Sequence, residues 1–491
     1  MIESDGMLFN SLVFIFLFLP ITFVCYFLLN RLKNQQFAIY WLVICSLFFY
    51  GYFEPSYLII ISVSILVNFF ISRLINKSNG KPRKWYMIVG VAFNIAVLCY
   101  FKYADFFISN VNKVLGTDIG LLHVLLPLGI SFITFQQISF IVDSYRGQTK
   151  NYKFGNYALF ITFFPQLIAG PIVQHDEMLP QYDIKKNRSI IHENIAKGLF
   201  IFTIGLVKKV AIADTVSVWA DDGFANYANL SFMEAWVTSL SYTTQLYFDF
   251  SGYCDMAIGL ALLFNIKLPV NFYSPYKARN IQEFWKKWHM TLNRFLTNYV
   301  YFPLGGSRKG SVRTYVNIMI IFFISGLWHG AGWNFILWGV MHGLASVVVR
   351  LFGKTNIKLP FLISWFITFQ FVNLAWVYFR ATSMEQANTI ILKMFDPNVT
   401  DMKEFFTLPI PNFSQAATYN VLGLSLGNPF VIIVVLFSMM MLSFFASNSI
   451  QLMDKMKFNW VTNVYMQFMI AVILVTIFYM QKNSVFLYFN F

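Results

Sequence analysis

The sequence predicts an all-α protein that crosses a membrane many times. Of its 491 residues, 57% are hydrophobic and only 12% are charged, whereas a soluble domain has about a quarter charged residues. The apolar residues fall in long runs, and lipid offers backbone N–H and C=O groups no partners, so each run must form a helix. We expect one polytopic domain over 1–491, with about 11 to 13 transmembrane helices and some re-entrant or interfacial helices.

The expected spans follow one another along the whole chain. The first, 8–30, is too long for the apolar core of a signal peptide and follows an acidic leader, so we interpret it as a retained span. The run 232–263 is long for one helix, and some central runs are candidates for re-entrant segments. The other expected spans are 36–53, 56–72, 85–101, 121–142, 157–173, 199–215, 314–327, 333–350, 361–379, 430–447 and 463–481.

Basic residues in the loops predict the orientation, because cytoplasmic loops carry an excess of Lys and Arg. Segment 277–313 holds eight basic residues against one acid, Glu283, and is expected in the cytoplasm. Residues 381–429 have few basic residues and are expected to form an extracytoplasmic loop. The N-terminus and the C-terminal tail, 482–491, then also lie outside the cytoplasm. The net charge of +14 is mostly a topology signal, and its scatter over membrane loops argues against nucleic-acid binding.

The cysteines give no sign of a metal or cofactor site. All four lie in or beside apolar runs, without the spacing of a metal centre. We interpret them as small apolar residues and expect no bound metal.

Residues 274–306 are too polar to cross the bilayer. Read as one helix, the segment places Trp285, His289, Leu292 and Leu296 on one face. This is the pattern of an amphipathic helix that lies at the cytoplasmic membrane surface or folds back into the protein. His289 is then either a site residue or a packed histidine in an interfacial aromatic belt.

The stretch "ISGLWHGAGW", residues 324–333, places an ionisable ring, His329, within an apolar run. A polar side chain at depth in a membrane is costly, and it faces the bundle interior or a water-filled path. A neutral imidazole there can act as a general base, taking a proton from a hydroxyl as its oxygen attacks an acyl group. The alternative is a histidine that is hydrogen-bonded between helices for packing.

The neighbours of this histidine are typical of a tight pocket. Gly326, Gly330 and Gly332 allow backbones to approach closely, or break the helix beside the ring. Trp328 and Trp333 would provide apolar walls.

Two of these segments resemble a family signature. "NFYSPYKARNIQEFWKKWHMTLNRFLTNYVYFPLGG" followed by "GLWHGAGWNFILWGVMHG" is similar to the signature of membrane-bound O-acyltransferases. The closer resemblance is to a bacterial branch with membrane subunits for alginate and peptidoglycan O-acetylation. "FFPQLIAGPIV" and "YFDFSGYCDMAIGLALLF" support it. The resemblance implies a helical bundle around a tunnel that crosses the membrane. It also implies a catalytic role for His329 and a second site histidine at His289.

The implied function is an acyltransferase of the bacterial inner membrane. It would take an acyl group, most simply acetyl, from acetyl-CoA or another thioester in the cytoplasm and deliver it for O-acetylation of a cell-envelope polysaccharide. No extracytoplasmic domain is large enough to hold a glycan, so we expect a secreted or membrane-anchored partner of the SGNH, serine-esterase-like type. Two alternatives remain open: a proton-coupled transporter or flippase with His329 as a proton relay, and a non-catalytic scaffold.

Several polar residues are candidates for supporting roles. Asp249 and Asp255 lie within an apolar run, where either could orient a histidine or pair with Lys208 or Lys209. A structural ion pair is the alternative. Gln136 is a candidate for lining the tunnel or for packing.

The donor and the tunnel have their own candidates. A basic cluster could attract the phosphates of coenzyme A, although positive-inside topology explains it equally well. Trp285 and Trp328 are candidates for the tunnel wall, and His342 is expected to be structural. The cluster comprises Lys277, Arg279, Lys286, Lys287 and Arg294.

The chain ends "FLYFNF", which is too short to span a membrane. The stretch could lie in the headgroup layer as an aromatic anchor. It also resembles tails in this bacterial branch, and the resemblance implies that Tyr488 carries the acyl group as a covalent relay.

Overall fold

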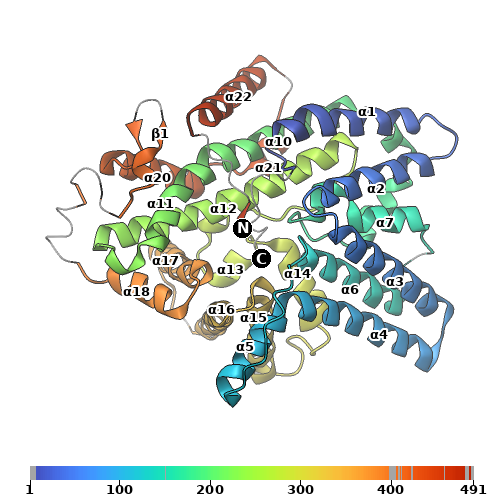
Figure 1. Ribbon diagram of the computed structural model, residues 1–491, viewed down its shortest axis with the longest axis horizontal. Helices are drawn as coiled ribbons and strands as arrows, with labels where there is room; N and C mark the ends of the chain where they lie inside the picture. The colour runs from blue at the N-terminus through green and yellow to red at the C-terminus, as the bar shows by residue number, and fades with distance from the viewer. Residues whose placement is uncertain are drawn as a thin grey trace. The chain divides into compact units, whose positions relative to one another are not determined.

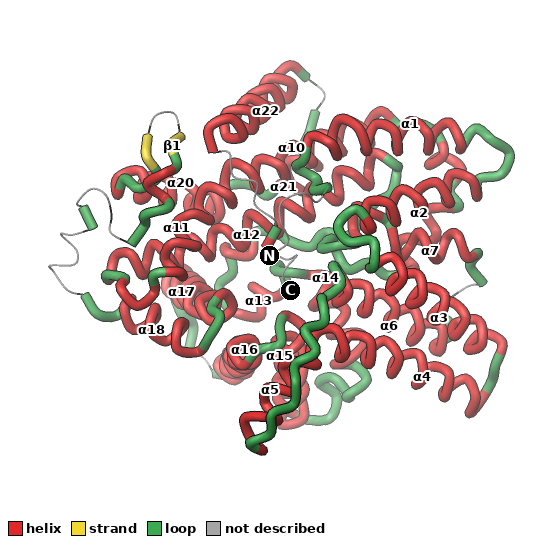
Figure 2. Tube along the Cα trace, viewed as in Figure 1, coloured by secondary structure: helices red, strands yellow, loops and turns green. Residues whose placement is uncertain are grey.

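The computed structural model describes residues 7–149, 151–355, 357–397, 405–406, 410, 412–421, 424–457, 459–480 and 486–487. Helices make up almost all of the regular structure, and the described strands form one short antiparallel ladder (Figure 2). This confirms the all-α class. The chain divides into two compact units. The first consists mainly of the residues up to Phe202 with Met256–Val270, and the second of Thr203–Asp255 and Asn271–Leu487.

In the first unit, α2 packs against α1 and α7, while α3, α4 and α6 pack against one another (Figure 1). Asn68 on α3 and Asn94 on α4 exchange buried side-chain hydrogen bonds of 2.6 and 3.2 Å, which is how polar groups join helices that lipid surrounds. The elements are η1 (Phe14–Phe18), α1 (Leu19–Leu29), α2 (Gln36–Gly51), α3 (Tyr57–Lys77), α4 (Gly80–Leu98), η2 (Cys99–Tyr103), α5 (Ala104–Leu115), α6 (Ile130–Arg146), α7 (Phe154–Thr162), α8 (Phe164–Leu167), α9 (His175–Tyr182), η3 (Lys185–Arg188) and the start of α10 (His192–Val207).

In the second unit, α16 packs against α15, α13 and α17 (Figure 1). The apolar stretch of α12 is completely buried, so any charge on it must find a partner inside the protein. The elements are η4 (Lys208–Ala213), α11 (Asp214–Ala225), η5 (Tyr227–Asn229), α12 (Phe232–Leu263), η6 (Pro275–Lys277), α13 (Ile281–Trp285), α14 (Met290–Leu296), η7 (Thr297–Tyr301), α15 (Ser311–His329), α16 (Trp333–Phe352), α17 (Phe361–Arg380), α18 (Met384–Met394), η8 (Ala416–Thr418), β1 (Asn420–Val421), β2 (Leu424–Ser425), α20 (Pro429–Phe445), α21 (Ser449–Asp454) and α22 (Trp460–Met480).

Membrane-spanning helices are abundant in the part of the chain that the structure describes. Six are long and apolar enough to cross a bilayer: α3, the continuous α4–η2–α5, α12, α15, α16 and α17. Shorter apolar helices accompany them at Phe14–Leu29, Gln36–Gly51, Pro429–Phe445 and Trp460–Val475. The polytopic character that the apolar runs predicted is confirmed.

Two predicted spans differ in the structure for reasons of backbone chemistry. Of the run 121–142, only the part from Ile130 onward is helical, because Pro127 cannot sit inside a helix and Gly129 has a left-handed φ of 70°. The run 157–173 is broken between α7 and α8, because Pro165 has no N–H to continue the first helix. By contrast, the long run 232–263 forms one helix of 32 residues.

Glycines allow α15 and α16 to touch along their backbones. A Cβ on Gly326 would lie 2.4 Å from the carbonyl oxygen of Phe335, and one on Gly339 would lie 2.3 Å from that of Phe322. Only glycine fits at such distances, so the close approach predicted for this segment is confirmed.

Candidate active site

The predicted amphipathic helix over 274–306 is broken at His289. This residue lies between α13 and α14 and has a left-handed backbone, with φ 44° and ψ 52°, so the prediction of one continuous helix was wrong. Asn271 explains the break. Its carbonyl accepts the N–H of Met290 at 2.9 Å, and its side-chain oxygen accepts the N–H of Thr291 at 3.2 Å. These N–H groups begin α14, and Asn271 satisfies them from outside the helix.

The apolar stripe of this segment is nevertheless buried together. Trp285, His289, Leu292 and Leu296 are each at most 5% exposed. The stripe therefore packs against the rest of the protein, and the position of the segment relative to the membrane surface stays a prediction.

The protonation state of His289 follows from its partner. Its Nδ1 lies 3.2 Å from Oδ1 of Asn271, and an amide oxygen only accepts hydrogen bonds. Nδ1 therefore carries the hydrogen, and Nε2 keeps its lone pair. Complete burial lowers the pKa of His289 to about 3, so the ring is neutral at physiological pH.

His329, the last residue of α15, faces His289 across an aromatic enclosure. The centroids of the two imidazole rings are 6.4 Å apart. The rings of Trp328, Trp338 and Phe379 lie edge-on to His329 at 4.8, 5.0 and 5.0 Å, and Trp328 also contacts His289 at 5.8 Å. Only 1% of His329 is exposed. The structure thus brings both predicted histidines and one predicted tryptophan into one enclosed site.

The prediction that Trp333 forms a second wall of the pocket was wrong. Trp333 begins α16 and is 59% exposed. Trp338, which is completely buried, takes its place because five helical steps turn its side chain about 140° away from that of Trp333.

His342 lies one aromatic layer behind this site. The indole N–H of Trp285 donates to its Nδ1 at 3.2 Å, and its ring lies 4.8 Å from that of Trp338. These contacts join α13 to α16, which fits the structural role expected of His342.

A cavity of about 230 Å³ lies beside this layer. Trp285 and Phe322 line it, and both rings also contact His342, at 5.2 and 6.2 Å. Lys286 and Arg350 contribute positive charge to its wall. The wall of the cavity therefore combines apolar and cationic groups.

Most of the predicted basic cluster has other partners. Lys277 donates to two backbone carbonyls at the end of α20, at 2.7 and 3.2 Å. Lys287 and Arg279 approach the Glu283 carboxylate at 2.8 and 3.8 Å. Arg294 is half-buried on α14. Of the cluster, only Lys286 is among the residues that line the cavity.

The two predicted carboxylates form buried ion pairs. Asp255 lies 2.6 Å from Nζ of Lys208, and Asp249 lies 2.8 Å from Nζ of Lys209. Lys209 is shared with a third carboxylate, Asp214, at 2.9 Å. Removing one member of a buried pair typically costs about 3–5 kcal/mol, because it leaves an uncompensated charge.

The last described residues of the chain also reach this unit. Phe486 is 1% exposed, and Leu487 donates its N–H to Asp249 at 3.0 Å. Tyr488, the predicted relay, lies outside the described residues.

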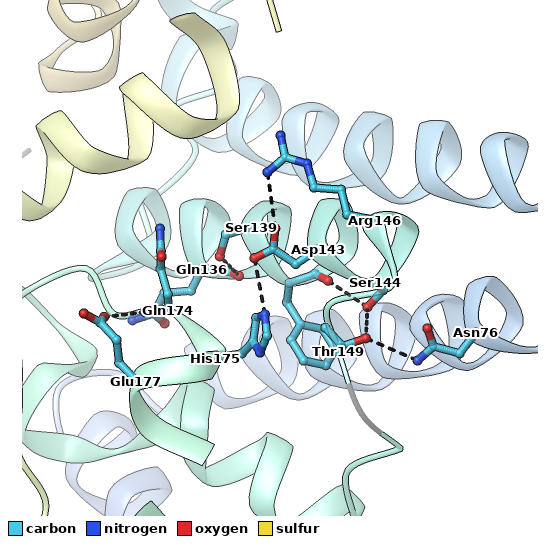
Figure 3. Close-up of polar contacts among 11 residues, drawn as sticks. Asn76, Gln136, Ser139, Asp143, Ser144, Arg146, Thr149, Gln174, His175 and Glu177 are labelled. Atoms are coloured by element: carbon cyan, nitrogen blue, oxygen red, sulfur yellow. Dashed lines mark hydrogen bonds and ion pairs between the residues drawn. The ribbon is translucent and has the colours of Figure 1, made fainter. Parts of the chain in front are cut away.

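Gln136 belongs to the first unit, in a polar layer that α6 and α9 share (Figure 3). Its backbone carbonyl accepts a hydrogen bond from the hydroxyl of Ser139 at 2.8 Å. One turn beyond Ser139 on α6, the carboxylate of Asp143 lies 3.4 Å from Nε2 of His175 and 3.5 Å from Arg146 (Figure 3). The hydrogen bond of Gln136 lies within α6, so its expected role, lining the tunnel or packing, stays a prediction. No sequence motif marked the buried Asp143–His175 pair, which joins α6 to α9.

Sequence reasoning also missed Asn271, Trp338, Asp214 and Arg350. Asn271 and Trp338 carry no motif of their own and gain their roles through contacts with other elements. Asp214 lies only five residues after Lys209, with which it pairs. Arg350 had a usable signal, since a basic residue at the predicted cytoplasmic end of a span belongs to the same charged face as 277–313.

Comparison with known proteins shows the family of this chain. The family model described as "MBOAT, membrane-bound O-acyltransferase family" matches residues 44–385, which include both site histidines. A peptidoglycan O-acetyltransferase from Helicobacter pylori is 43% identical, over 99% of this chain and 98% of that protein. A probable alginate O-acetylase from Pseudomonas putida is 39% identical, over 79% of this chain and 80% of that protein. A teichoic acid D-alanyltransferase from Streptococcus thermophilus is 27% identical, over 48% of this chain and 60% of its own length.

These matches separate the alternatives that the sequence left open. The relatives are named as transferases of acetyl or D-alanyl groups, and none of those compared is named as a transporter or a scaffold. The buried histidine pair lies inside the matched region. This multi-pass membrane protein is an acyltransferase and belongs to the membrane-bound O-acyltransferase family.

Proposed function

We propose that the protein O-acetylates a cell-envelope polysaccharide with acetyl groups that it takes from a cytoplasmic thioester such as acetyl-CoA. The names of the relatives from Helicobacter pylori and Pseudomonas putida each combine an acetyl group with an envelope polysaccharide. Peptidoglycan is the favoured acceptor, because that relative matches almost the whole chain at 43% identity. D-alanine is less favoured, because the D-alanyltransferase covers only 48% of it.

The observation that carries the proposal is the enclosed pair of His289 and His329. A base that removes a proton from a hydroxyl must be neutral, and removal of water strengthens its interaction with the reacting groups. The 1% exposure of His329 and its aromatic neighbours provide such surroundings. His289 keeps its Nε2 as an acceptor, so it orients the attacking hydroxyl.

The chemical step balances without any further reactant. The hydroxyl oxygen attacks the thioester carbonyl, the C–O bond forms and the C–S bond breaks. His329 takes the hydroxyl proton and passes it to the departing thiolate, which leaves as a thiol. The imidazole is neutral again, and the acceptor carries an acetyl ester.

The cavity beside Trp285 is the proposed donor site. Lys286 and Arg350 would bind the phosphates of the donor. The acyl arm would pass Trp285, whose ring lies 5.8 Å from that of Trp338, the neighbour of His329. Positive charge at the mouth and aromatic rings toward the histidines match the two ends of an acyl thioester.

The first acceptor in this scheme is the phenol of Tyr488. A phenyl ester is more reactive than an alkyl ester, so it can be passed on to a second nucleophile. We place both termini outside the cytoplasm and the protein in the inner membrane. A secreted or membrane-anchored serine esterase of the SGNH type would accept the group and complete transfer to the glycan.

The test is whether the purified protein acquires an acetyl group. Protein in detergent is mixed with labelled acetyl-CoA, and its intact mass is measured beside that of a His329→Gln variant. We expect an increase of one acetyl mass in the unmodified protein and none in the variant. Transport of label into vesicles without an acetylated protein would contradict the proposal.

A further inference from the structure

A buried cluster of three charged residues joins η4, α11 and α12. The ammonium of Lys209 lies 2.9 Å from Asp214 and 2.8 Å from Asp249. The exposed fractions of the three side chains are 1%, 6% and 2%. The charges therefore lie in surroundings where an unpaired charge is costly.

The C-terminal segment docks on this cluster. Leu487 donates its backbone N–H to the second carboxylate oxygen of Asp249 at 3.0 Å. The ammonium of Lys209 lies 4.6 Å from the centre of the Phe486 ring. The ring of Tyr253 meets that of Phe486 edge-on at 4.9 Å. The tail thus offers a backbone donor to the Asp249 carboxylate and an aromatic face to the Lys209 cation.

Helix α12, which carries Asp249 and Tyr253, also contacts the histidine site through a neighbouring row of side chains. Asp249 and Tyr253 are one helical turn apart on α12 and hold the tail. The residues that follow each of them, Phe250 and Cys254, form the next stripe. Phe250 lies edge-on to His289 at 4.9 Å, and Cys254 accepts a hydrogen bond at 3.4 Å from Asn271, which holds His289.

We propose that Lys209, Asp249 and Tyr253 form a binding site for the protein's own C-terminal segment. The site recognises an aromatic ring followed by a backbone N–H, which Phe486 and Leu487 supply. Because Leu487 directly precedes Tyr488 in the chain, the site restricts where the Tyr488 hydroxyl can go. Lys209 and Asp249 are then positioning residues for acyl transfer, a consequence that rests on the proposed function.

Carboxypeptidase digestion of the full-length protein tests the binding itself. Residues held in a buried site are released only from the population in which the tail is detached. In the unmodified protein, we expect digestion from the C-terminus to stop without releasing Leu487. Phe486→Leu keeps an apolar side chain and removes the aromatic face, so release of Leu487 should become about tenfold faster, as expected for loss of one buried cation–π contact. Asp249→Asn should act in the same direction.

Asp255→Asn is the matched control. It alters the neighbouring buried pair with Lys208, on the same helix, and should leave release of Leu487 unchanged. Equal release from the unmodified protein, Phe486→Leu and Asp249→Asn would overturn the proposal. Phe486 lies in the tail rather than in the helical core, so this variant keeps the test valid if Asp249→Asn fails to fold.

Acetyl transfer provides the second measurement. Phe486→Leu should lower the rate at which label reaches the C-terminal peptide, and Tyr488→Phe should lose the label while Leu487 stays protected. Faster release of Leu487 with an unchanged rate of labelling would overturn the positioning role. Absence of label on the unmodified protein would refute the proposed function, and the digestion would still decide whether the site binds the tail.

Discussion

The rings of His289 and His329 lie 6.4 Å apart. His289 lies between two short helices, α13 and α14, whereas His329 is the last residue of the long helix α15. Asn271 fixes the first position by accepting hydrogen bonds from the backbone on the C-terminal side of His289. Backbone contact at Gly326 and Gly339 fixes the second, because it holds α15 against α16. Two independent packing arrangements therefore converge on one pair of imidazoles.

Replacing His329 tests the proposed base. His329→Gln keeps a polar side chain of similar size and cannot accept the hydroxyl proton, so acetylation of the envelope polymer should fall by about 100-fold or more. Protein level in the membrane should stay normal. The same change at His192, an exposed histidine at the start of α10, is the control. Near-normal acetylation in His329→Gln cells would rule out a catalytic role, and His289→Ala should have a milder effect.

The lowered pKa of His289 predicts a pH-dependent stability. Its pKa is about 3 when folded, below the value of about 6.5 in an unfolded chain. The unfolded state therefore binds more protons below pH 6.5, and stability is lost as the pH falls from 6.5 toward 3. Between pH 7 and pH 5 this one histidine should cost about 2 kcal/mol.

A His289→Gln variant measures this contribution. The variant is less stable overall, but its free energy of unfolding should depend less on pH over the same interval. Denaturant unfolding of both proteins in detergent, at pH 7 and pH 5, gives the comparison. Parallel losses in the two proteins would show that His289 does not titrate as its burial predicts.

The donor cavity can be tested through its two cations. Lys286→Ala and Arg350→Ala should each raise the KM for acetyl-CoA about tenfold, as expected when one charge-assisted hydrogen bond is lost. The kcat should change little, because these residues lie away from the reacting atoms. Lys354→Ala, at an exposed lysine just beyond α16, is the matched control. If none of the three variants changed the KM from that of the unmodified protein, the donor would bind elsewhere.

Removal of one oxygen distinguishes the two roles considered for Tyr488. Tyr488→Phe keeps the ring that an anchor needs and removes the nucleophile that a relay needs. We expect normal expression and insertion, loss of polymer acetylation, and no labelled acetyl on the C-terminal peptide. Full activity in this variant would leave the tail as an anchor, and His329 would then serve the partner's hydroxyl directly.

The predicted orientation is tested by thiol labelling in intact cells. In a background without native cysteines, Lys81→Cys and Lys309→Cys should be shielded from a membrane-impermeant reagent, and Glu385→Cys should be labelled. All three side chains are exposed, so labelling reports the side of the membrane rather than burial. Labelling at Lys81→Cys would contradict the predicted orientation, and with it the proposed direction of acyl transfer.

The sequence by itself determined the all-α membrane class, because apolar runs leave the backbone no choice but helices. It also singled out His329, an ionisable ring in an apolar run, where such a ring is costly. His289 stood out by its place on the apolar face of 274–306 and by the family resemblance. The partners of Asp249 and Asp255 were foreseeable too. A buried carboxylate needs a cation, and lysines stood in a neighbouring apolar run.

Tertiary structure decided what local patterns could not express. The break at His289 depends on Asn271, whose backbone and side chain compete with the helical hydrogen bonds that the apolar period predicted. Trp338 rather than Trp333 walls the site, because packing of α15 on α16 selects which face of α16 is buried. The docking of Phe486 on Lys209 joins segments far apart in the chain. Such contacts depend on how helices pack in three dimensions, which the period of a single helix does not encode.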